Sequence, residues 1–338
     1  MANVTDYVRD ARMARIMLSM MAAPDDPMTG KVVSSVGGTE TLRLLDSDHG
    51  VPLLNNTEAK VWRARLAPLL GLGVLTRADE YEELGLHTLI PTDDYWPKSL
   101  SDLGPRQPYV LWVHGAASLL SGPVSDRVTI TGSRAATHYG EHVTSSLATD
   151  LSSEERIIVG GGDYGIEGAA HRWTLAAGGH TIAVLAGGID QRYPSSHAAL
   201  LDAIGDVGLL VTELPPGIPP KQPYFLARHR LMAAISGATV VVEASTGSGA
   251  SNIAREAAAL GRAVGAVPGP VTSATSSGTN TMLRNGSAAV ITQASDALNL
   301  LDGRPASTPQ PDQMSPISSA DPQLSTNTPR RLPSAWVL

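Results

Sequence analysis

Short apolar runs alternate with amphipathic stretches from Val128 onward, and this alternation constrains the fold more than any other feature. Strands are expected at 128–131, 157–159, 181–185, 208–211, 239–243 and 263–267, with helices near 139–152, 166–177, 195–204, 225–236 and 249–260. Near-continuous Val, Ile and Leu runs are typical of a parallel sheet covered by helices on both faces. Because crossover connections are right-handed, such a sheet is doubly wound. The predicted fold class is therefore α/β, with a Rossmann-like, mostly parallel sheet.

Three segments are expected along the chain: a small helical N-terminal domain over 1–90, the Rossmann-like domain with its lead-in over 91–302, and a tail over 303–338. In the first segment Met13, Ile16, Met17 and Met20 recur at helical spacing and indicate core packing. Thr57 is expected to cap a helix whose apolar face holds Val61, Leu66, Leu69 and Leu70. The tail is rich in Pro and Ser without apolar periodicity, which predicts disorder.

The composition excludes several classes of protein. The 338 residues include no cysteine, so disulfides and thiolate metal sites are ruled out. The N-terminus lacks a continuous apolar region, and no apolar run approaches the ~20 residues that span a bilayer, so we expect a cytoplasmic protein without a membrane segment. A net charge of −7 argues against a broad duplex-binding surface, although it permits a local basic groove.

Glycine and small hydroxyl residues follow four of the expected strands. They occur in Gly132-Ser133-Arg134, in 160–165, in 187–190 and in 244–251. Ligands of open α/β sheets bind at the carboxyl ends of the strands, where such residues let backbone N–H groups approach a phosphate. The candidate backbone positions are Gly132, Ser133, Gly161, Gly165, Ser248 and Gly249.

Basic residues lie close to these loops and to the only phenylalanine of the chain, Phe225. The candidate phosphate-binding side chains are Arg134, Lys221, Arg228 and Arg230, and we expect Arg134 and Arg228 to face solvent. An aromatic ring beside arginines is typical of sites that grip single strands by base stacking. Phe225 therefore has two interpretations, a base-stacking ring or a plug in the core.

Motifs of catalysis are absent. The sequence contains no G-x-x-x-x-G-K-[ST], no H-E-x-x-H and no G-x-S-x-G. His171 lies in an expected helix and is interpreted as a packing histidine, while Glu213 and Glu243 end strands without an evident partner base. We therefore expect no catalytic residues, no metal and no cofactor.

The order of these segments resembles the DprA/Smf family of DNA-processing proteins over about 93–290. The matching segments are Asp93-Asp94-Tyr95-Trp96-Pro97, Gly132-Ser133-Arg134 with Tyr139-Gly140, Gly161…Gly165-Ile166-Glu167, Tyr193-Pro194, Glu213 with Pro215-Pro216-Gly217, Phe225…Arg228-His229-Arg230, Ser248-Gly249 and Val267-Pro268-Gly269. The chain departs from the family pattern at Asp163, Glu167, Leu226 and His229. Asp163 is expected to add negative charge beside the phosphate site.

The resemblance implies a non-catalytic, homodimeric protein that binds and protects single-stranded DNA and helps to load a RecA-type recombinase. A different class remains open, a nucleotide-derivative sensor or phosphoribohydrolase of the related lysine-decarboxylase-like group, although the Pro-Gly-Gly-x-Gly-Thr-x-x-Glu motif of that group is missing. A third alternative is an interaction protein that has lost its pocket and acts through its N-terminal segment and tail.

Overall fold

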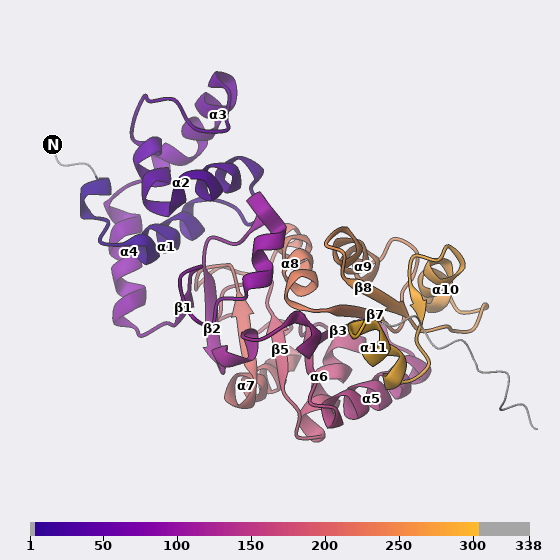
Figure 1. Ribbon diagram of the computed structural model, residues 1–338. Helices are drawn as coiled ribbons and strands as arrows, with labels where there is room; N and C mark the ends of the chain where they lie inside the picture. Colours follow the sequence, from indigo (N-terminus) through magenta and orange to yellow (C-terminus); the bar gives the residue numbers. More distant parts are fainter. Residues whose placement is uncertain (1–3, 304–338) are drawn as a thin grey trace, which may run out of the picture. The chain divides into compact units, whose positions relative to one another are not determined.

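The computed structural model describes residues 4–303, and within them nine strands form one sheet in the order β1-β2-β6-β5-β4-β3-β7-β8-β9 (Figure 1). The strands are β1 (Thr88–Leu89), β2 (Leu111–Gly115), β3 (Arg127–Thr131), β4 (Ile157–Gly160), β5 (Thr181–Val184), β6 (Leu209–Thr212), β7 (Ala238–Val241), β8 (Ala263–Ala266) and β9 (Ala289–Val290). All six predicted strands are present, and β1, β2 and β9 are additions that the sequence pattern did not reveal.

The sheet is parallel from β6 to β9, which confirms the predicted fold class. At its centre Val128 of β3 lies opposite Ile158 of β4 on one side and Ala238 of β7 on the other. Only the edge departs from this pattern, because β2 pairs antiparallel with β6 and β1 pairs antiparallel with β2.

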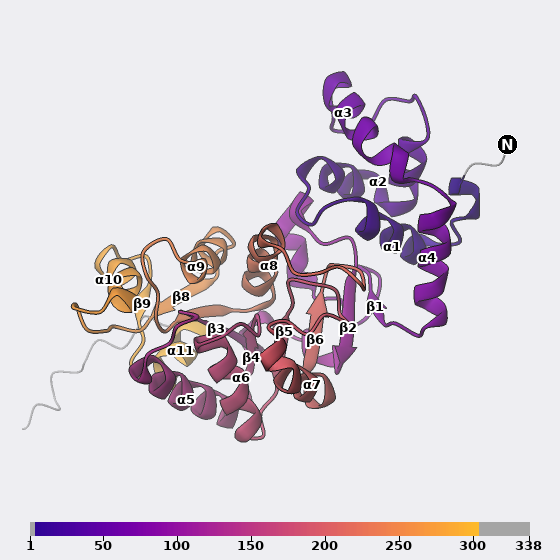
Figure 2. The ribbon, with the colours of Figure 1, turned by 180° about the vertical axis from the view of Figure 1, so that it is seen from behind.

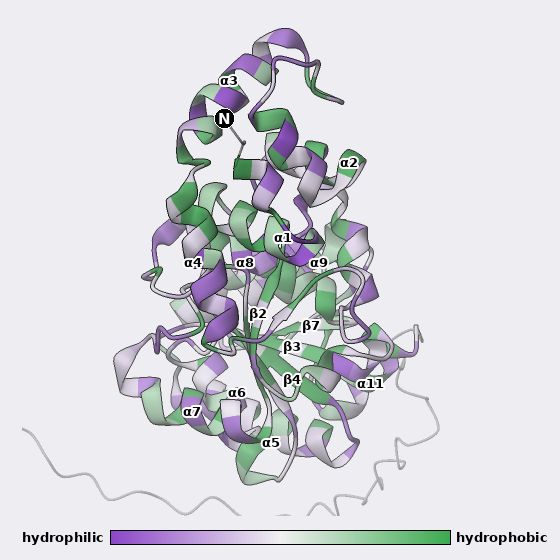
Figure 3. Cartoon of the chain, turned by 90° about the vertical axis from the view of Figure 1, so that its left-hand side faces the viewer, coloured by the Kyte–Doolittle hydropathy of each residue, from purple (hydrophilic) through white to green (hydrophobic). Residues whose placement is uncertain are grey.

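Helices cover both faces of the sheet (Figures 1 and 2). They are α5 (His138–Ser153), α6 (Ile166–Ala176), α7 (Ala198–Val207), α8 (Gln222–Ile235), α9 (Gly249–Ala259), α10 (Ser277–Arg284) and α11 (Ala294–Leu301). Val128 and Ile130 of β3 pack in the core beneath α5, α6 and α11. The alternate residue Thr129 faces α8 and donates to the carbonyl of Met232 at 3.2 Å. Figure 3 shows the apolar strands enclosed between helices that carry hydrophilic residues outward.

Four helices precede the sheet: α1 (Ala11–Met21), α2 (Pro27–Leu45), α3 (Asn56–Leu66) and α4 (Leu72–Glu83). Met13, Ile16 and Met17 are buried in their common core and Met20 is partly buried against it, as the helical spacing predicted. The short 3₁₀ helices are η1 (Val4–Tyr7), η2 (Ala67–Leu69), η3 (Lys98–Arg106), η4 (Ala117–Leu120), η5 (Val124–Asp126), η6 (Ser195–His197) and η7 (Ala274–Ser276).

The prediction for α3 is wrong in its cap and only partly right in its apolar face, of which Leu66 is buried and Leu70 is partly buried. Asn55, not Thr57, is the N-cap, and it forms a capping box with Glu58. The reciprocal bonds of a capping box satisfy two backbone donors, so this residue outcompetes a threonine two positions later. Val61 and Leu69 are exposed, whereas the buried side chains of α3 are those of Ala59, Trp62 and Leu66.

The core of the N-terminal helices continues into the edge of the sheet. Tyr81 of α4 packs edge-on against Trp112 of β2, with ring centroids 5.1 Å apart. The domain boundary near residue 90 stays a prediction, and the expected disordered tail lies, apart from Gly303, outside the described residues. None of the helices within 4–303 is long and apolar enough to cross a membrane.

Arg106, the last residue of η3, connects segments far apart in the sequence. Its guanidinium group binds Asp25, before α2, at 2.8 and 2.9 Å, and Glu256 of α9 at 2.8 and 3.0 Å. Its carbonyl accepts from Nε of Arg230 in α8 at 2.8 Å. One residue thus ties α8 and α9 to each other and to the N-terminal segment.

Candidate functional site: a crevice at the carboxyl ends of the strands

The chain reverses its direction across the sheet between β3 and β7. From β3 the chain proceeds through β4, β5 and β6 on one side, and from β7 it proceeds through β8 and β9 on the other. The loops that follow two such strands diverge and leave a crevice between them, which is where open α/β sheets bind ligands. A cavity of about 500 Å³ occupies this place. It is lined by Thr131, Gly132, Ser133, Arg134, Ala135, Asp163, Glu167, Gln222, Phe225, Leu226, Arg228, His229, Ser245, Gly247, Ser248, Gly249, Ala250, Asn252 and Ile253.

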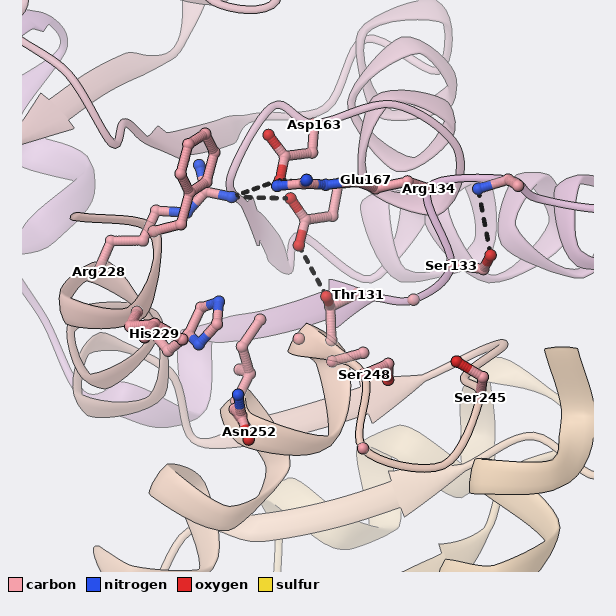
Figure 4. Close-up of a pocket in the computed structure, with 18 of the residues that line it drawn as sticks. Thr131, Ser133, Arg134, Asp163, Glu167, Arg228, His229, Ser245, Ser248 and Asn252 are labelled. Atoms are coloured by element: carbon pink, nitrogen blue, oxygen red, sulfur yellow. Dashed lines mark hydrogen bonds and ion pairs between the residues drawn. The ribbon is translucent and has the colours of Figure 1, made fainter. Parts of the chain in front are cut away.

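Small residues form the two opposing loops of the crevice (Figure 4). After β3, the Ser133 hydroxyl accepts from the N–H of Ala135 at 3.1 Å, and the Ser133 carbonyl accepts from Ile166 at the start of α6. After β7, Ser248 is the N-cap of α9 and Gly249 is its first residue. The first-turn N–H groups of a helix lack intrahelical acceptors and favour an anion. The α9 end of the crevice is therefore suited to a phosphate.

Asp163 joins the two arginines of the crevice. Its Oδ2 atom accepts from Nη2 of Arg134 and from Nη2 of Arg228, both at 2.7 Å. The Arg134 side chain is 58 % exposed, and among the described residues none accepts a hydrogen bond from its Nη1 atom. The expected negative charge of Asp163 is present, and two guanidinium groups compensate it. Arg134 thus retains, in Nη1, a donor group without an acceptor among the described residues.

Arg228 is buried, so the expectation that it faces solvent is wrong. Its side chain is 4 % exposed, and Nη1 donates to the carbonyl of Gly161 at 2.8 Å. Arg228 belongs to the second turn of α8 and lies beneath the loop after β4. Backbone carbonyls there accept hydrogen bonds from its guanidinium group. Arg228 thus contributes positive charge to the crevice from beneath its surface.

Phe225 is half-buried and lies outside the apolar core clusters of the described chain. The guanidinium carbons of Arg134 and Arg228 lie 5.0 and 4.9 Å from its ring centroid. Such cation–π contacts hold a guanidinium group over a ring face. The ring therefore lies at the crevice, in contact with both arginines, and not in the apolar core.

Burial perturbs the two other ionisable residues of the crevice. Loss of hydration raises the pKa of the Glu167 carboxyl, although Arg228, 3.8 Å away, opposes the shift. Glu167 accepts from the Thr131 hydroxyl at 2.7 Å and from the N–H of Gly161 at 2.9 Å. Burial, together with the charge of Arg228, lowers the pKa of His229 to about 4, so this imidazole is neutral at pH 7. Positive charge in the crevice therefore comes from the arginines.

Four of the predicted site residues lie outside the lining. Arg230 is fully buried and donates to both carboxylate oxygens of Glu213, at 2.6 and 2.7 Å. Lys221 is the exposed N-cap of α8. A side chain at Gly161 would overlap the Arg228 guanidinium, and one at Gly165, where φ is +71°, would overlap the carbonyl of Ser133. These glycines permit close packing beneath the crevice.

The three residues to which the sequence analysis gave no catalytic role have hydrogen-bond partners in the structure. His171 is fully buried with Nδ1 2.7 Å from the Thr181 hydroxyl, which agrees with a packing role. Glu213 binds Arg230, and Glu243 accepts from the Thr137 hydroxyl at 2.7 Å and from the Thr275 hydroxyl at 3.1 Å. Both acids therefore have hydrogen-bond partners that spacing in the sequence did not reveal.

Gln222 and Asn252 line the crevice and were not predicted. Asn252 lies four residues after Ser248, the N-cap of α9, so helical spacing places the two residues on the same side. This spacing was the feature of the sequence from which Asn252 could have been predicted. Within residues 4–303 no cluster of three or more His, Cys, Asp or Glu side chains is arranged to hold a metal ion.

Comparison with known proteins assigns the chain to a family. Residues 87–302 match the model of the family described as DNA recombination-mediator protein A. A DprA relative from Mycobacterium tuberculosis is 43 % identical over 296 residues, which cover 84 % of this chain and 73 % of the relative. The DNA processing protein DprA of Bacillus subtilis is 32 % identical over 62 % of this chain and 70 % of its own length.

Solved structures agree with this assignment. DprA from Streptococcus pneumoniae superposes with a TM-score of 0.69 at 26 % identity and covers 85 % of this chain and 96 % of its own. DNA processing protein A from Helicobacter pylori, a protein with a described mode of single-stranded DNA binding, has a TM-score of 0.58 at 28 % identity, over 64 % of this chain and 97 % of its own. With its Gly-Ser-Arg loop, its nine-stranded sheet and these relatives, the chain belongs to the DprA/Smf family of DNA-processing proteins.

Proposed function

We propose that this chain binds single-stranded DNA with a phosphate in the crevice between the loops after β3 and β7. The observation that carries the proposal is the exposed guanidinium group of Arg134, which lies beside the crevice lined by the first turn of α9. A strand phosphate placed there receives charge-assisted hydrogen bonds from Arg134 and backbone N–H groups from α9.

Two features favour a single strand over a duplex. The net charge of −7 disfavours the broad phosphate contact that duplex binding uses, whereas a hollow of about 500 Å³ suits a few nucleotides. Phe225, half-buried at the same site, offers an aromatic ring to a base that is free of its stack. The single-stranded DNA binding described for the Helicobacter pylori relative supports this choice.

The protein acts in this proposal without catalysis. Both carboxylates of the crevice are engaged, Asp163 by two arginines and Glu167 by Thr131 and the N–H of Gly161. The proposed role requires no cofactor. The bound strand is protected and passed to a RecA-type recombinase by a cytoplasmic homodimer. The family description as a recombination mediator supports a role in recombination.

The test is a titration of fluorescent oligo-dT, the matching dA·dT duplex and free mononucleotides at several salt concentrations. Single strands should bind more tightly than duplex, with a log K against log salt slope of about −0.7 per contacted phosphate. Equal affinities for the single strand and the duplex would contradict the proposal. Tight binding of a mononucleotide, with none of oligo-dT, would favour a nucleotide-derivative sensor instead.

Variants locate the site in the same titration. Arg134→Ala should weaken oligo-dT binding by about tenfold or more, because a charge-assisted phosphate contact contributes about 1.5–3 kcal/mol. Arg77→Ala is the matched control, since Arg77 is 60 % exposed and also carries one ion pair, with Glu80. Unchanged binding by Arg134→Ala would place the site elsewhere.

A further inference from the structure

We infer that Tyr193 and Tyr164 form a base-stacking surface at the rim of the crevice, for the nucleotides next to the one whose phosphate Arg134 holds. This inference rests on the proposed function and adds a second binding element to it. Neither tyrosine lines the crevice itself.

Both tyrosines lie at the carboxyl ends of neighbouring strands. Tyr164 follows β4, and Tyr193 lies in the loop after β5; β4 and β5 are adjacent and parallel. Each residue is 46 % exposed, a large open fraction for an aromatic side chain. They therefore extend the strand-end surface from the crevice toward the β5 side of the sheet.

Neighbouring rings fix the orientation of each tyrosine. Tyr193 meets Phe225 at a centroid distance of 5.7 Å and an interplanar angle of 69°. Tyr164 meets His197 at 4.9 Å and 66°, and its hydroxyl accepts from Ser196 at 2.8 Å. Rings that are already held lose little conformational freedom when a base stacks on them, and this favours binding.

The tyrosines connect directly to the phosphate-binding group. Tyr193 contacts Phe225, whose ring lies 5.0 Å from the guanidinium carbon of Arg134. Tyr164 follows Asp163, which holds the same guanidinium through Nη2. A strand with one phosphate at Arg134 would thus bring its adjoining bases to these rings. Because every base has a π face, the surface would accept any sequence.

The test compares oligo-dT with an abasic oligonucleotide of equal length, which presents the same phosphates without bases. Tyr193→Ala in the full chain should weaken oligo-dT binding by about 5- to 150-fold and leave abasic binding unchanged. Tyr193→Phe keeps the ring and should bind like the wild type, and Tyr164→Ala should behave like Tyr193→Ala. Tyr95→Ala is the matched control, because Tyr95 is 47 % exposed and lies in the lead-in before η3.

Two results would overturn the inference while leaving the proposed function intact. One is wild-type affinity of Tyr193→Ala for oligo-dT while Arg134→Ala is weakened. The other is an equal loss on both oligonucleotides, which would mean that Tyr193 only positions Phe225 and Arg134. Failure of the wild type to bind either oligonucleotide would instead refute the proposed function itself.

Discussion

Arg230 and Glu213 form a buried, two-pronged ion pair between α8 and the end of β6, with N–O distances of 2.6 and 2.7 Å. The pair lies apart from the crevice that holds Arg228, although the two arginines are only two positions apart in α8. Successive helical residues turn by about 100°, so residues i and i+2 face different sides. Arg230 is therefore a structural residue.

Arg230→Ala should lower the free energy of unfolding by about 3–5 kcal/mol, because it leaves the Glu213 carboxylate buried without its partner. Urea unfolding measures this loss. Arg43→Ala is the control, since its pair with Glu40 is exposed and such pairs contribute ~0–1 kcal/mol. Unchanged stability together with lost DNA binding would show that Arg230 contacts the ligand.

Asp163→Asn should tighten single-stranded DNA binding several-fold at low salt. The substitution removes the anion that competes with phosphate for Arg134 and Arg228, and the local potential becomes more positive. Stability should fall, because Arg228 is buried and loses its charged partner. Anisotropy titrations and urea melts report the two effects. The control is Asp202→Asn, which breaks the exposed pair with Arg192 and should change neither affinity nor stability. Weaker binding by Asp163→Asn would mean that Asp163 orients Arg134 for the phosphate.

Gly165→Ala should destabilise the fold by more than Gly217→Ala. Both glycines have positive φ, +71° and +81°, but an added methyl group at Gly165 would overlap the carbonyls of Ser133 and Arg134, whereas Gly217 has open space around it. Gly217→Ala measures the backbone strain alone, about 1–3 kcal/mol. The difference between the two losses of unfolding free energy measures the steric crowding of the added methyl group against the loop after β3. Equal losses would mean that this loop moves aside easily.

Acid should destabilise the protein through His171. Burial lowers the pKa of His171 to about 3 from the ordinary value of 6.5. Between these pH values the unfolded chain binds a proton that the folded chain does not, so stability falls as the pH falls, by up to about 1.4 kcal/mol per unit. His171→Asn should flatten this dependence in urea melts between pH 7 and 4. His138→Asn, at an exposed position, should leave it unchanged.

Phe225→Ala should weaken single-stranded DNA binding while changing stability little. The ring is half-buried and contacts two guanidinium groups, so its loss removes a stacking surface and the support of Arg134. The expected cost is about 1–3 kcal/mol in affinity. A loss of about 3–5 kcal/mol in unfolding free energy, with normal affinity in the folded fraction, would instead identify Phe225 as a core residue.

The central strands could be predicted because runs of β-branched residues such as 128–131 and 157–159 are almost wholly buried and leave a clear pattern. β2, next to the edge strand β1, was missed because its antiparallel pairing with β6 breaks the alternation of strands and helices and its last two residues are exposed. The same sequence reasoning found seven residues of the crevice, Gly132, Ser133, Arg134, Phe225, Arg228, Ser248 and Gly249. The mutual contacts of Asp163, Arg134 and Arg228 depend on how α8 is rotated against β4, and composition does not reveal that rotation.

Arg106 joins α8 to α9 from outside the crevice, through its carbonyl on one side and its guanidinium group on the other. The residues that it binds there, Arg230 and Glu256, are absent from the crevice lining. The spacing between these two helices is thus set in part from outside the crevice lining. Leu226, an exposed position where the chain leaves the family pattern, makes none of these contacts, so it can be exchanged while Arg106 still joins the two helices. Part of what holds the two walls of the crevice together is thus separate from the side chains that line it, and a change of recognition at an exposed lining position leaves that part intact.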